Sequence, residues 1–438
     1  MFIAREANVK LHTSTAETRA KAINNLASLL IQNQADILSE NTRDIRTAES
    51  MGVQKSLLAR LKLTPSKILT LSDGLRQIAT GCLTKKGHVG CVLERTKLAN
   101  NLMLEKVTAP IGVLMVIFES RPDCLPQVAA LSIATANSLL AKPGSEAVHS
   151  VRLLHQLIGE ALVSANLPVT AVGLFTSRKD VQYVLNCGQS ENLVDLIIPR
   201  GSPTMIQSVR RAVSEAGSAV PVLGHGAGVC HVYVDEAADP EKAIRVVQDS
   251  KCDYPAACNS METLLVHKSH LVTGLLERLC KHMKANGVEL FGGRSLFRLA
   301  PNLSEGMKPA VGPSVEYGDL KCTVDVVENM DHAISHIAEH GSAHTEAIVT
   351  ENPQTAEEFL QKTDSACVFH NTSTRFADGY RFGLGAEVGI NTGRIHSRGP
   401  VGIEGLLTTK WILRGNGQCV SDFTAGNQKF IHERLPIS

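Results

Sequence analysis

The sequence places one cysteine where a covalent nucleophile could act. Cys258 lies in Y-P-A-A-C-N-S-M-E-T, directly before the apolar run 261–267, so a loop at the end of a strand would present its side chain. A thiolate attacks acyl carbon, and hydride can reduce the resulting thioester to an aldehyde. The alternative is a small buried apolar side chain, which is the commoner role of a cysteine. Cys252, in the same segment, is expected to pack rather than to act as a redox partner.

Two other segments could bind a nucleotide. Lys142 follows a β-rich run and precedes Pro143-Gly144-Ser145, which would place an ammonium at the carboxyl end of a sheet; a solvated lysine is the alternative. Gly201 and Ser202 lie at a strand-to-helix turn, where free N–H groups attract phosphate. No G-x-G-x-x-G follows a strand and no G-x-x-x-x-G-K-[ST] occurs, so neither the usual dinucleotide fingerprint nor a P-loop kinase is indicated.

Arginines gather in a glycine-rich stretch near the end of the chain: Arg375, Arg381, Arg394 and Arg398. Planar guanidinium groups suit carboxylates and phosphates, so a substrate with both groups is one reading. Ion pairs at the surface are the alternative. His340 and His344 lack the spacing of a metal motif, so no metal site is predicted.

The elements that must position these residues follow an alternating pattern. Before residue 112 the chain reads as helical, with Ser14-x-x-Glu17 in the form of a capping box. From there on, β-rich runs alternate with helical stretches, as in successive βα units around a parallel sheet. The runs of a first series lie at 112–118, 138–142, 171–175, 193–198 and 219–224, with helices at 146–165 and 203–216, and those of a second series lie at 229–235, 261–267, 346–350 and 366–371. The glycine-rich segment 224–228 between the two series is the expected hinge.

The bulk composition limits the class of protein. A chain of 438 residues favours two compact domains. A net charge of +1 gives no global attraction to nucleic acid or to an anionic membrane. Eleven cysteines without a C-x-x-C pair favour reduced thiols, and hence cytosol or mitochondrial matrix. The most apolar stretch, 107–118, is shorter than the roughly 20 residues that a membrane helix needs.

Four longer motifs are more specific when taken together. They are F-E-S-R-P-D (118–123), D-S-K-C-D-Y-P-A-A-C-N (249–259), the run from V-E-N-M-D to T-E-A-I (327–348) and F-G-L-G-A-E-V-G-I (382–390). With them the chain resembles the γ-glutamyl phosphate reductase family, a branch of the aldehyde dehydrogenase superfamily, from its first helices to about Phe423. The segments D-S-A-C-V-F and R-G-P-V-G-I-E-G-L-L-T-T-K-W most resemble the reductase half of the bifunctional eukaryotic pyrroline-5-carboxylate synthase. The kinase half of that enzyme has no counterpart in this sequence.

This resemblance implies an α/β fold of the aldehyde dehydrogenase type. It implies a Rossmann-type NADPH-binding domain at 1–228 with a flap near 90–108, a catalytic domain at 229–400 and a C-terminal oligomerisation segment at 401–438. The implied activity is NADPH-dependent reduction of L-glutamyl 5-phosphate to L-glutamate 5-semialdehyde in proline biosynthesis, through a thioester on Cys258. A homodimer, a filament with a glutamate kinase domain and a mitochondrial or cytoplasmic location are also expected. Another aldehyde dehydrogenase and a mainly structural assembly module are the alternatives.

The resemblance also assigns roles within the site. Ser120 stands in place of the oxyanion-hole asparagine of general aldehyde dehydrogenases, with the Cys258 N–H as the second donor and Asn259 completing the catalytic group. The residues expected to bind the cofactor are Ile117, Glu119, Lys142, Pro143, Ser145, Gly201, Ser202, Gly224 and Glu316. Those expected to bind the substrate are Arg121, Arg375, Arg394 and Arg398.

Two departures from general aldehyde dehydrogenases bear on the reaction. Ser145 occupies the place where NAD-preferring relatives often carry a glutamate, and the absence of that carboxylate favours a cofactor with a 2′-phosphate. Val222 takes the place of the general base that activates water for thioester hydrolysis. A reductase has no hydrolytic step, so this loss favours reduction over oxidation.

Overall fold

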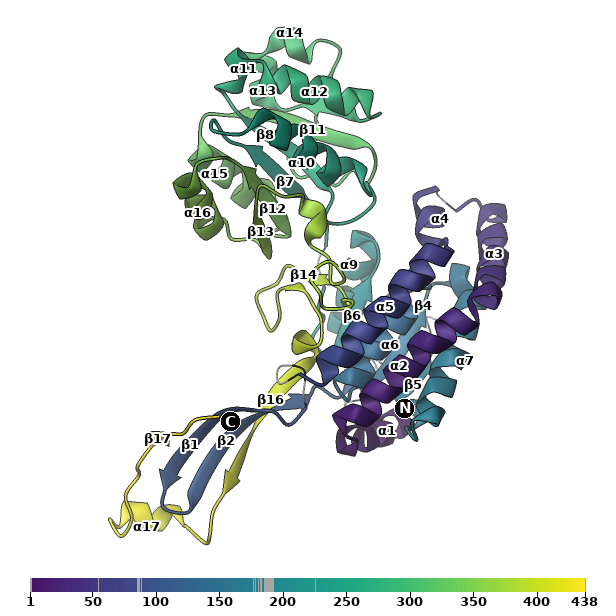
Figure 1. Cartoon of the computed structure of the whole chain (residues 1–438), viewed down its shortest axis with the longest axis vertical. Coiled ribbons are helices and arrows are strands. Elements are labelled where there is room, and N and C mark those ends of the chain that lie inside the picture. Colours follow the sequence, from purple (N-terminus) through teal and green to yellow (C-terminus); the bar gives the residue numbers. More distant parts are fainter. Residues whose placement is uncertain are drawn as a thin grey trace.

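Figure 1 shows the computed structural model of the chain, which describes residues 2–53, 55–84, 87, 89–175, 177, 179, 181, 183–184, 193–224 and 226–437. Two parallel sheets, each flanked by helices, form two units, and an antiparallel flap projects away from them. The predicted α/β class is therefore confirmed. Among the described residues, no helix combines the length and the apolar character needed to cross a membrane.

The chain opens with five helices: α1 (Phe2–Thr13), α2 (Ala16–Gln32), α3 (Gln34–Ser50), α4 (Lys55–Leu61) and α5 (Pro65–Cys82). The predicted capping box is wrong by one residue. Thr15 caps α2, since its hydroxyl accepts the Thr18 N–H at 3.2 Å, whereas the Ser14 hydroxyl donates to the Leu11 carbonyl at 2.6 Å. Ser14 thus serves the open carbonyl end of α1, which leaves the next residue to begin α2.

The first parallel sheet has the strand order β5-β4-β3-β6. Its strands are β3 (Val113–Phe118), β4 (Ser138–Pro143), β5 (Val172–Leu174) and β6 (Leu196–Arg200), and its helices are α6 (Cys124–Ala134), η1 (Ser145–Ala147), α7 (Val148–Ser164), η2 (Val169–Ala171) and α9 (Pro203–Glu215). The chain runs outward from β3 through β4 to β5 and then returns to the other side of β3 with β6. Ligands of open α/β sheets bind at such a reversal, beyond the carboxyl ends of the strands.

One predicted strand of the first series is wrong. Residues 219–224 form a single bridge, between Val222 and Ile197, instead of a strand. Pro221 has no N–H and so cannot extend a ladder on both sides. The two hydrogen bonds at this bridge use the Pro221 carbonyl, at 3.0 Å from the Ile197 nitrogen, and the Leu223 N–H, at 2.9 Å from the Ile197 carbonyl.

The second parallel sheet has the order β10-β9-β11-β8-β7-β12-β13. Its strands are β7 (Cys230–Val234), β8 (Met261–His267), β9 (Glu289–Gly292), β10 (Lys308–Pro309), β11 (Lys321–Val327), β12 (Thr345–Val349) and β13 (Cys367–His370). Its helices are α10 (Pro240–Cys252), α11 (His270–Thr273), α12 (Leu275–Ala285), α13 (Arg294–Leu299), α14 (Pro301–Ser304), α15 (Met330–His340) and α16 (Pro353–Lys362). The four runs predicted for the second series are confirmed as strands, and three further strands escaped prediction.

The flap is a four-stranded antiparallel sheet that joins distant parts of the sequence. It consists of β1 (Val92–Ala99), β2 (Leu102–Pro110), β16 (Leu407–Arg414) and β17 (Glu433–Arg434), and the remaining short elements are η3 (Thr374–Phe376), β14 (Ile390–Asn391), β15 (Gly399–Pro400), η4 (Glu404–Leu406) and α17 (Val420–Thr424). The flap predicted near 90–108 and the oligomerisation segment predicted at 401–438 thus contribute strands to one sheet within this chain.

The core of the first unit uses residues from both ends of the chain. Helices α2, α5, α6 and α7 pack on one face of the first sheet, and Ala386, Val388 and Val401 are buried in the same apolar cluster. The chain therefore returns to the first unit before residue 400. The predicted domain limits at 228 and 400 stay predictions.

Candidate active site

A cavity of about 750 Å³ lies between the two parallel sheets. Its wall comprises residues that follow β3 and β6, together with residues from the segments that precede β7, β8 and β11. The carboxyl edge of the first sheet and the amino edge of the second sheet therefore face the same space. On the side of the first sheet, this space adjoins the reversal of strand order between β3 and β6, where a nucleotide is expected to bind.

Cys258 is half-buried in this wall, on the loop 253–260 between α10 and β8. A turn shapes the loop, since the Ala257 N–H donates to the Tyr254 carbonyl at 3.1 Å. Gly228 packs behind it so closely that a Cβ atom there would lie 2.1 Å from the Cys258 carbonyl oxygen. The backbone of the loop is thereby held from behind, and the predicted position of Cys258 at a sheet end is confirmed.

The other thiols with shifted pKa values are poor nucleophiles. Burial raises the pKa of Cys124, Cys280 and Cys367 to about 11, and it raises the pKa of Cys230 well above its ordinary value. Cys230 instead donates its S–H to the Cys258 carbonyl at 3.3 Å and so supports the loop. Among the described residues of the cavity wall, Cys258 is the one cysteine. The position of Cys258 therefore favours the nucleophile over the alternative of a buried apolar side chain.

Several residues predicted to bind the cofactor lie in the same wall, namely Glu119, Gly201, Ser202, Gly224 and Glu316. Ser202 caps α9, because its hydroxyl accepts the Met205 N–H at 3.3 Å. The first turn of α9 therefore begins at the cavity, where its N–H groups favour an anion. A Cβ atom at Gly201 would lie 2.4 Å from the end of the Met205 side chain and 2.8 Å from the Glu119 carboxylate, so a larger residue here would have to displace these two side chains.

The other predicted cofactor residues lie at the carboxyl edge of the first sheet but outside the cavity wall. Ile117 is opposite Lys142 in the pairing of β3 with β4, and Ser145 begins η1. The Lys142 ammonium donates to the Pro143 carbonyl at 2.8 Å. Their cofactor contacts stay predictions.

Ser120 is not placed as the oxyanion role requires. It is buried, it has a left-handed φ of 49°, and it is absent from the described lining of the cavity. Its hydroxyl donates to Glu146 at 2.9 Å, and its N–H donates to the same carboxylate oxygen. Because both donors are directed at Glu146, the structure offers neither of them to an oxyanion beside Cys258.

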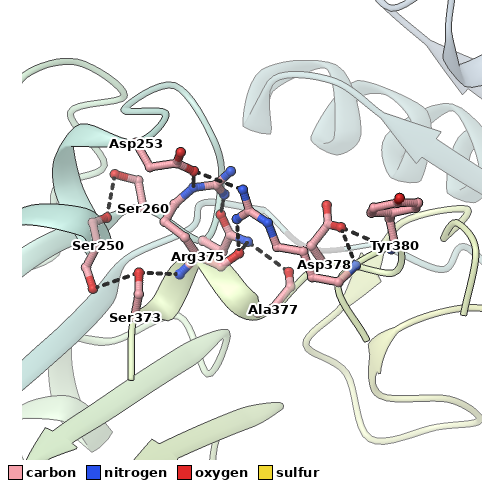
Figure 2. Close-up of polar contacts among 10 residues, drawn as sticks. Ser250, Asp253, Ser260, Ser373, Arg375, Ala377, Asp378 and Tyr380 are labelled. Carbon is pink, nitrogen blue, oxygen red and sulfur yellow. Dashed lines mark hydrogen bonds and ion pairs between the residues drawn. The ribbon is translucent and has the colours of Figure 1, made fainter. Parts of the chain in front are cut away.

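Arg375 lies in a network of polar contacts with Asp253 (Figure 2). Arg375 and Asn259 are both buried, and they meet beside the loop 253–260, called here the nucleophile loop. The Arg375 guanidinium donates to the Asn259 side-chain oxygen and, at 3.1 Å, to Asp253. The Asn259 amide donates to the Ala377 carbonyl at 2.8 Å. Arg381 joins the network through Asp253 at 3.1 Å. Asp253 and Asn259, near the two ends of the loop 253–260, are thus both bonded to Arg375. Asn259 also lies in the cavity wall, and its catalytic role stays a prediction.

The four arginines predicted to bind substrate fall into two groups. Arg121 and Arg375 line the cavity. Arg394 and Arg398 instead pair with Asp364, and neither is among the described residues of the cavity wall. The structure therefore supports the alternative of surface ion pairs for this second group.

Four charged residues of the described wall escaped prediction, namely Arg60, Arg200, Asp378 and Glu387. Arg200 and Glu387 form a pair at 3.5 Å, and burial raises the pKa of Glu387 although Arg200 opposes the shift. Arg60 donates to the Ala256 carbonyl at 2.6 Å, two residues before Cys258. Arg200 ends a predicted strand beside Gly201 and could have been found from that position, whereas Arg60 lies in a helix with no local signal.

The histidines singled out in the sequence serve other contacts. His344 is buried and pairs through Nδ1 with the Thr345 hydroxyl at 2.8 Å, and the His340 ring packs against His336 at 4.8 Å between centroids. Within the part of the chain that the structure describes, no group of three or more His, Cys, Asp or Glu side chains is arranged to hold a metal ion.

Comparison with known proteins agrees with this architecture. Residues 1–290 match the aldehyde dehydrogenase family, so the chain belongs to that family. The crystal structure of γ-glutamyl phosphate reductase from Thermotoga maritima is 34% identical, with a TM-score of 0.84, and the match covers 95% of this chain and 98% of that one. γ-Glutamyl phosphate reductase from Prochlorococcus marinus is 41% identical over 99% of this chain and 95% of its own length. The chain belongs to the γ-glutamyl phosphate reductases, as its motifs predicted.

Longer relatives contain the same region. Delta-1-pyrroline-5-carboxylate synthase A from Arabidopsis thaliana is 45% identical over 434 residues, which cover 99% of this chain. The chain spans 58% of the length of that relative. The predicted likeness to the reductase half of such a synthase is therefore confirmed.

Proposed function

We propose that this chain reduces L-glutamyl 5-phosphate to L-glutamate 5-semialdehyde and phosphate, with NADPH as reductant and Cys258 as nucleophile. The observation that carries the proposal is the cavity between the sheets, in which one thiol faces the phosphate-binding end of a nucleotide fold. Arg121 and Arg200 in the same wall supply positive charge for an acyl phosphate. The γ-glutamyl phosphate reductases from Prochlorococcus marinus and Thermotoga maritima match this chain over 99% and 95% of its length, which is 95% and 98% of their own length.

The wall fits a dinucleotide. The start of α9 offers N–H groups to a pyrophosphate, and Gly201 keeps the backbone open there. Glu316, which the family resemblance assigns to the nicotinamide ribose, lies in the same wall. Ser145 at the adenosine end carries no charge that would repel a 2′-phosphate, while the neighbouring Glu146 is turned onto Ser120. These features support NADPH as the cofactor.

In the proposed mechanism the Cys258 thiolate attacks the γ-carbonyl carbon of the substrate. A carbon–sulfur bond forms, the bond to the phosphate oxygen breaks, and phosphate leaves toward Arg121. The Cys258 N–H stabilises the transient oxyanion. Cys258 then holds the acyl group as a thioester. A nicotinamide cofactor, when bound, would supply the hydride to the acyl carbon. Cleavage of the carbon–sulfur bond then releases the aldehyde and returns Cys258 as a thiolate.

An aldehyde dehydrogenase that oxidises free aldehydes to acids is the nearest alternative. Such an enzyme needs a base to activate water, whereas this chain has the half-buried Val222 at that position, bridged to Ile197. Phosphate dependence distinguishes the two reactions, because only the acyl-phosphate route consumes phosphate in reverse.

The test follows NADPH formation from pyrroline carboxylate, phosphate and NADP. Wild type is expected to require phosphate, and Cys258→Ser is expected to lose at least about 1,000-fold in rate, because a serine hydroxyl lacks the thiolate's nucleophilicity. Cys252→Ser is the matched control, since Cys252 is also half-buried but lies outside the cavity wall. An active Cys258→Ser variant would remove the thiol from the mechanism, and phosphate-independent turnover would indicate the oxidising enzyme.

We also propose that copies of the chain associate through the flap, as a dimer or within a filament of a bifunctional enzyme. Trp411 and Leu413 are exposed on β16, and exposed apolar side chains on one strand favour contact with another copy. Light scattering of Trp411→Glu tests this, with a shift to monomer as the expected result. An unchanged mass would favour association elsewhere. The mitochondrial or cytoplasmic location is part of the same proposal.

A further inference from the structure

A buried ion pair closes the base of the nucleophile loop. Lys251, in the last turn of α10, donates to Glu262, near the start of β8, at 2.8 Å. Both side chains have no exposed surface. The loop 253–260 that carries Cys258 therefore begins and ends at the two partners of one salt bridge.

The second oxygen of Glu262 reaches the segment that carries Glu316. It accepts the Gly318 N–H at 3.2 Å. Tyr317 is held by Phe291, at 5.1 Å between ring centroids. Glu316 itself accepts the Gly228 N–H at 3.0 Å, and Gly228 is the residue that packs behind the Cys258 carbonyl.

A single carboxylate thus links the base of the loop that carries Cys258 to the turn that carries Glu316, both on the side of the second sheet. We propose that Glu262 is a positioning residue, which, held by Lys251, fixes the turn 316–318 so that Glu316 faces the cofactor side of the Cys258 cavity. The inference rests on the proposed function, in which Glu316 contacts the cofactor.

The chemistry of the pair explains why a carboxylate is needed here. A well-packed apolar pair often stabilises a fold as much as a buried salt bridge does. An apolar side chain in place of Glu262, however, could not accept the Lys251 ammonium and the Gly318 N–H together. The pair therefore serves geometry rather than stability alone.

Glu262→Gln tests this role. The amide has one acceptor oxygen, and when that oxygen serves Lys251, the NH2 group is turned against the Gly318 N–H and displaces the turn. NADPH binding, measured by calorimetry, is expected to weaken about tenfold, as for Glu316→Gln. The double variant is expected to bind no more weakly than Glu316→Gln alone, because Glu262 acts through Glu316. Alkylation of Cys258 without cofactor is expected to stay within about twofold of wild type.

A rescue variant separates positioning from general stability. In Lys251→Met/Glu262→Gln the amide oxygen no longer has an ammonium to serve, so it can accept the Gly318 N–H again. NADPH affinity is expected to return to within about threefold of wild type. Glu346→Gln is the matched control, because Glu346 is a buried glutamate of the same sheet that pairs with His231, and it should leave NADPH affinity unchanged.

The outcomes are distinguishable. Wild-type NADPH affinity in Glu262→Gln, additive losses in the double variant or the absence of rescue would each overturn the inference. If the wild-type protein itself neither binds NADPH nor turns over, the proposed function fails, whatever Glu262 does. Should Glu262→Gln not fold, Glu262→Asp, which keeps the charge but withdraws it by one methylene, is measured in the same way, with the same expected loss.

Discussion

Two arginines from one glycine-rich stretch, Arg375 and Arg394, differ in burial and in the acid with which they pair. Arg375 has a side chain that is 9% exposed, and it contacts Asp253 and Asn259 beside the nucleophile loop. Arg394 has a side chain that is 74% exposed, and it pairs with Asp364 outside the cavity wall. The residue type and the glycine-rich surroundings are the same. What differs is the acid that each arginine meets, and that acid is 122 residues away in sequence for Arg375 and 30 for Arg394.

The largest effect on stability and turnover is expected when Arg375 is replaced. Arg375→Ala leaves Asn259 without its guanidinium partner and Asp253 with Arg381 alone, and a loss of about 3 kcal/mol in the free energy of unfolding is expected. The turnover number should fall about 100-fold, because the loop that carries Cys258 is released. Arg375→Lys is the control that keeps the charge without the planar fork. A variant with normal turnover and a raised KM for the acyl phosphate would instead restore the predicted role in substrate binding.

A smaller effect is expected at the shared acid of the first group. Asp253→Asn removes the charge that both Arg375 and Arg381 contact, but it leaves the bond from Arg375 to Asn259 in place. Turnover is expected to fall about fivefold to tenfold, with little change in the KM for NADPH. Steady-state kinetics in the reverse direction measures both values. A loss as large as that of Arg375→Ala would mean that Asn259 contributes nothing to the network.

The second group should respond little. Arg394→Ala and Arg398→Ala each remove a contact with one exposed acid, and such pairs contribute about 0–1 kcal/mol. Turnover and KM values are expected to stay within about twofold of wild type. A tenfold rise in the KM for phosphate in either variant would show that this loop reaches the substrate during the reaction.

The smallest expected effect is on acid stability. Burial acts to raise the pKa of Asp253, but Arg381 and Arg375 outweigh it, so the net shift is downward. A carboxylate with a lowered pKa stabilises the fold above its unfolded pKa of about 3.9 and loses that contribution as the pH falls further. The advantage of wild type over Asp253→Asn in urea unfolding should therefore be present at pH 6 and shrink below about pH 4. The advantage over Asp364→Asn should be small throughout, because Asp364 is exposed. An advantage over Asp253→Asn that grew as the pH fell would reverse this assignment.

Much of the fold could be predicted because it depends on local pattern. The runs that became β4, β7, β8 and β12 each contain at least three consecutive apolar residues, as strands buried on both faces favour. The strand β11 escaped prediction since its charged residue Asp325 interrupts the apolar pattern, although that carboxylate is used by the Leu296 N–H at 2.8 Å. Residues 219–224 show the opposite error: a strand was predicted from their apolar residues, but Pro221 lacks the N–H that would continue the ladder.

The residues of the candidate site could be predicted where the position of a motif in the sequence is enough to place them in the cavity wall. Cys258, Gly201 and Glu316 lie in one wall as expected. The orientation of Ser120 was not predictable, because it depends on Glu146, whose carboxylate turns back onto it. The position of Asn259 likewise depends on a contact with Arg375 across 116 residues. Side-chain pairing at that separation leaves no trace in spacing or periodicity.

The shared core of the first unit has a consequence for synthesis. All strands of the second sheet lie between residues 230 and 370, so a ribosome has delivered every one of them before Ala386, Val388 and Val401 emerge. Those three residues belong to the apolar cluster that the N-terminal helices begin. Domains commonly fold in the order in which they are made. Here the half of the protein that is made first is the half that must wait for the last part of the chain.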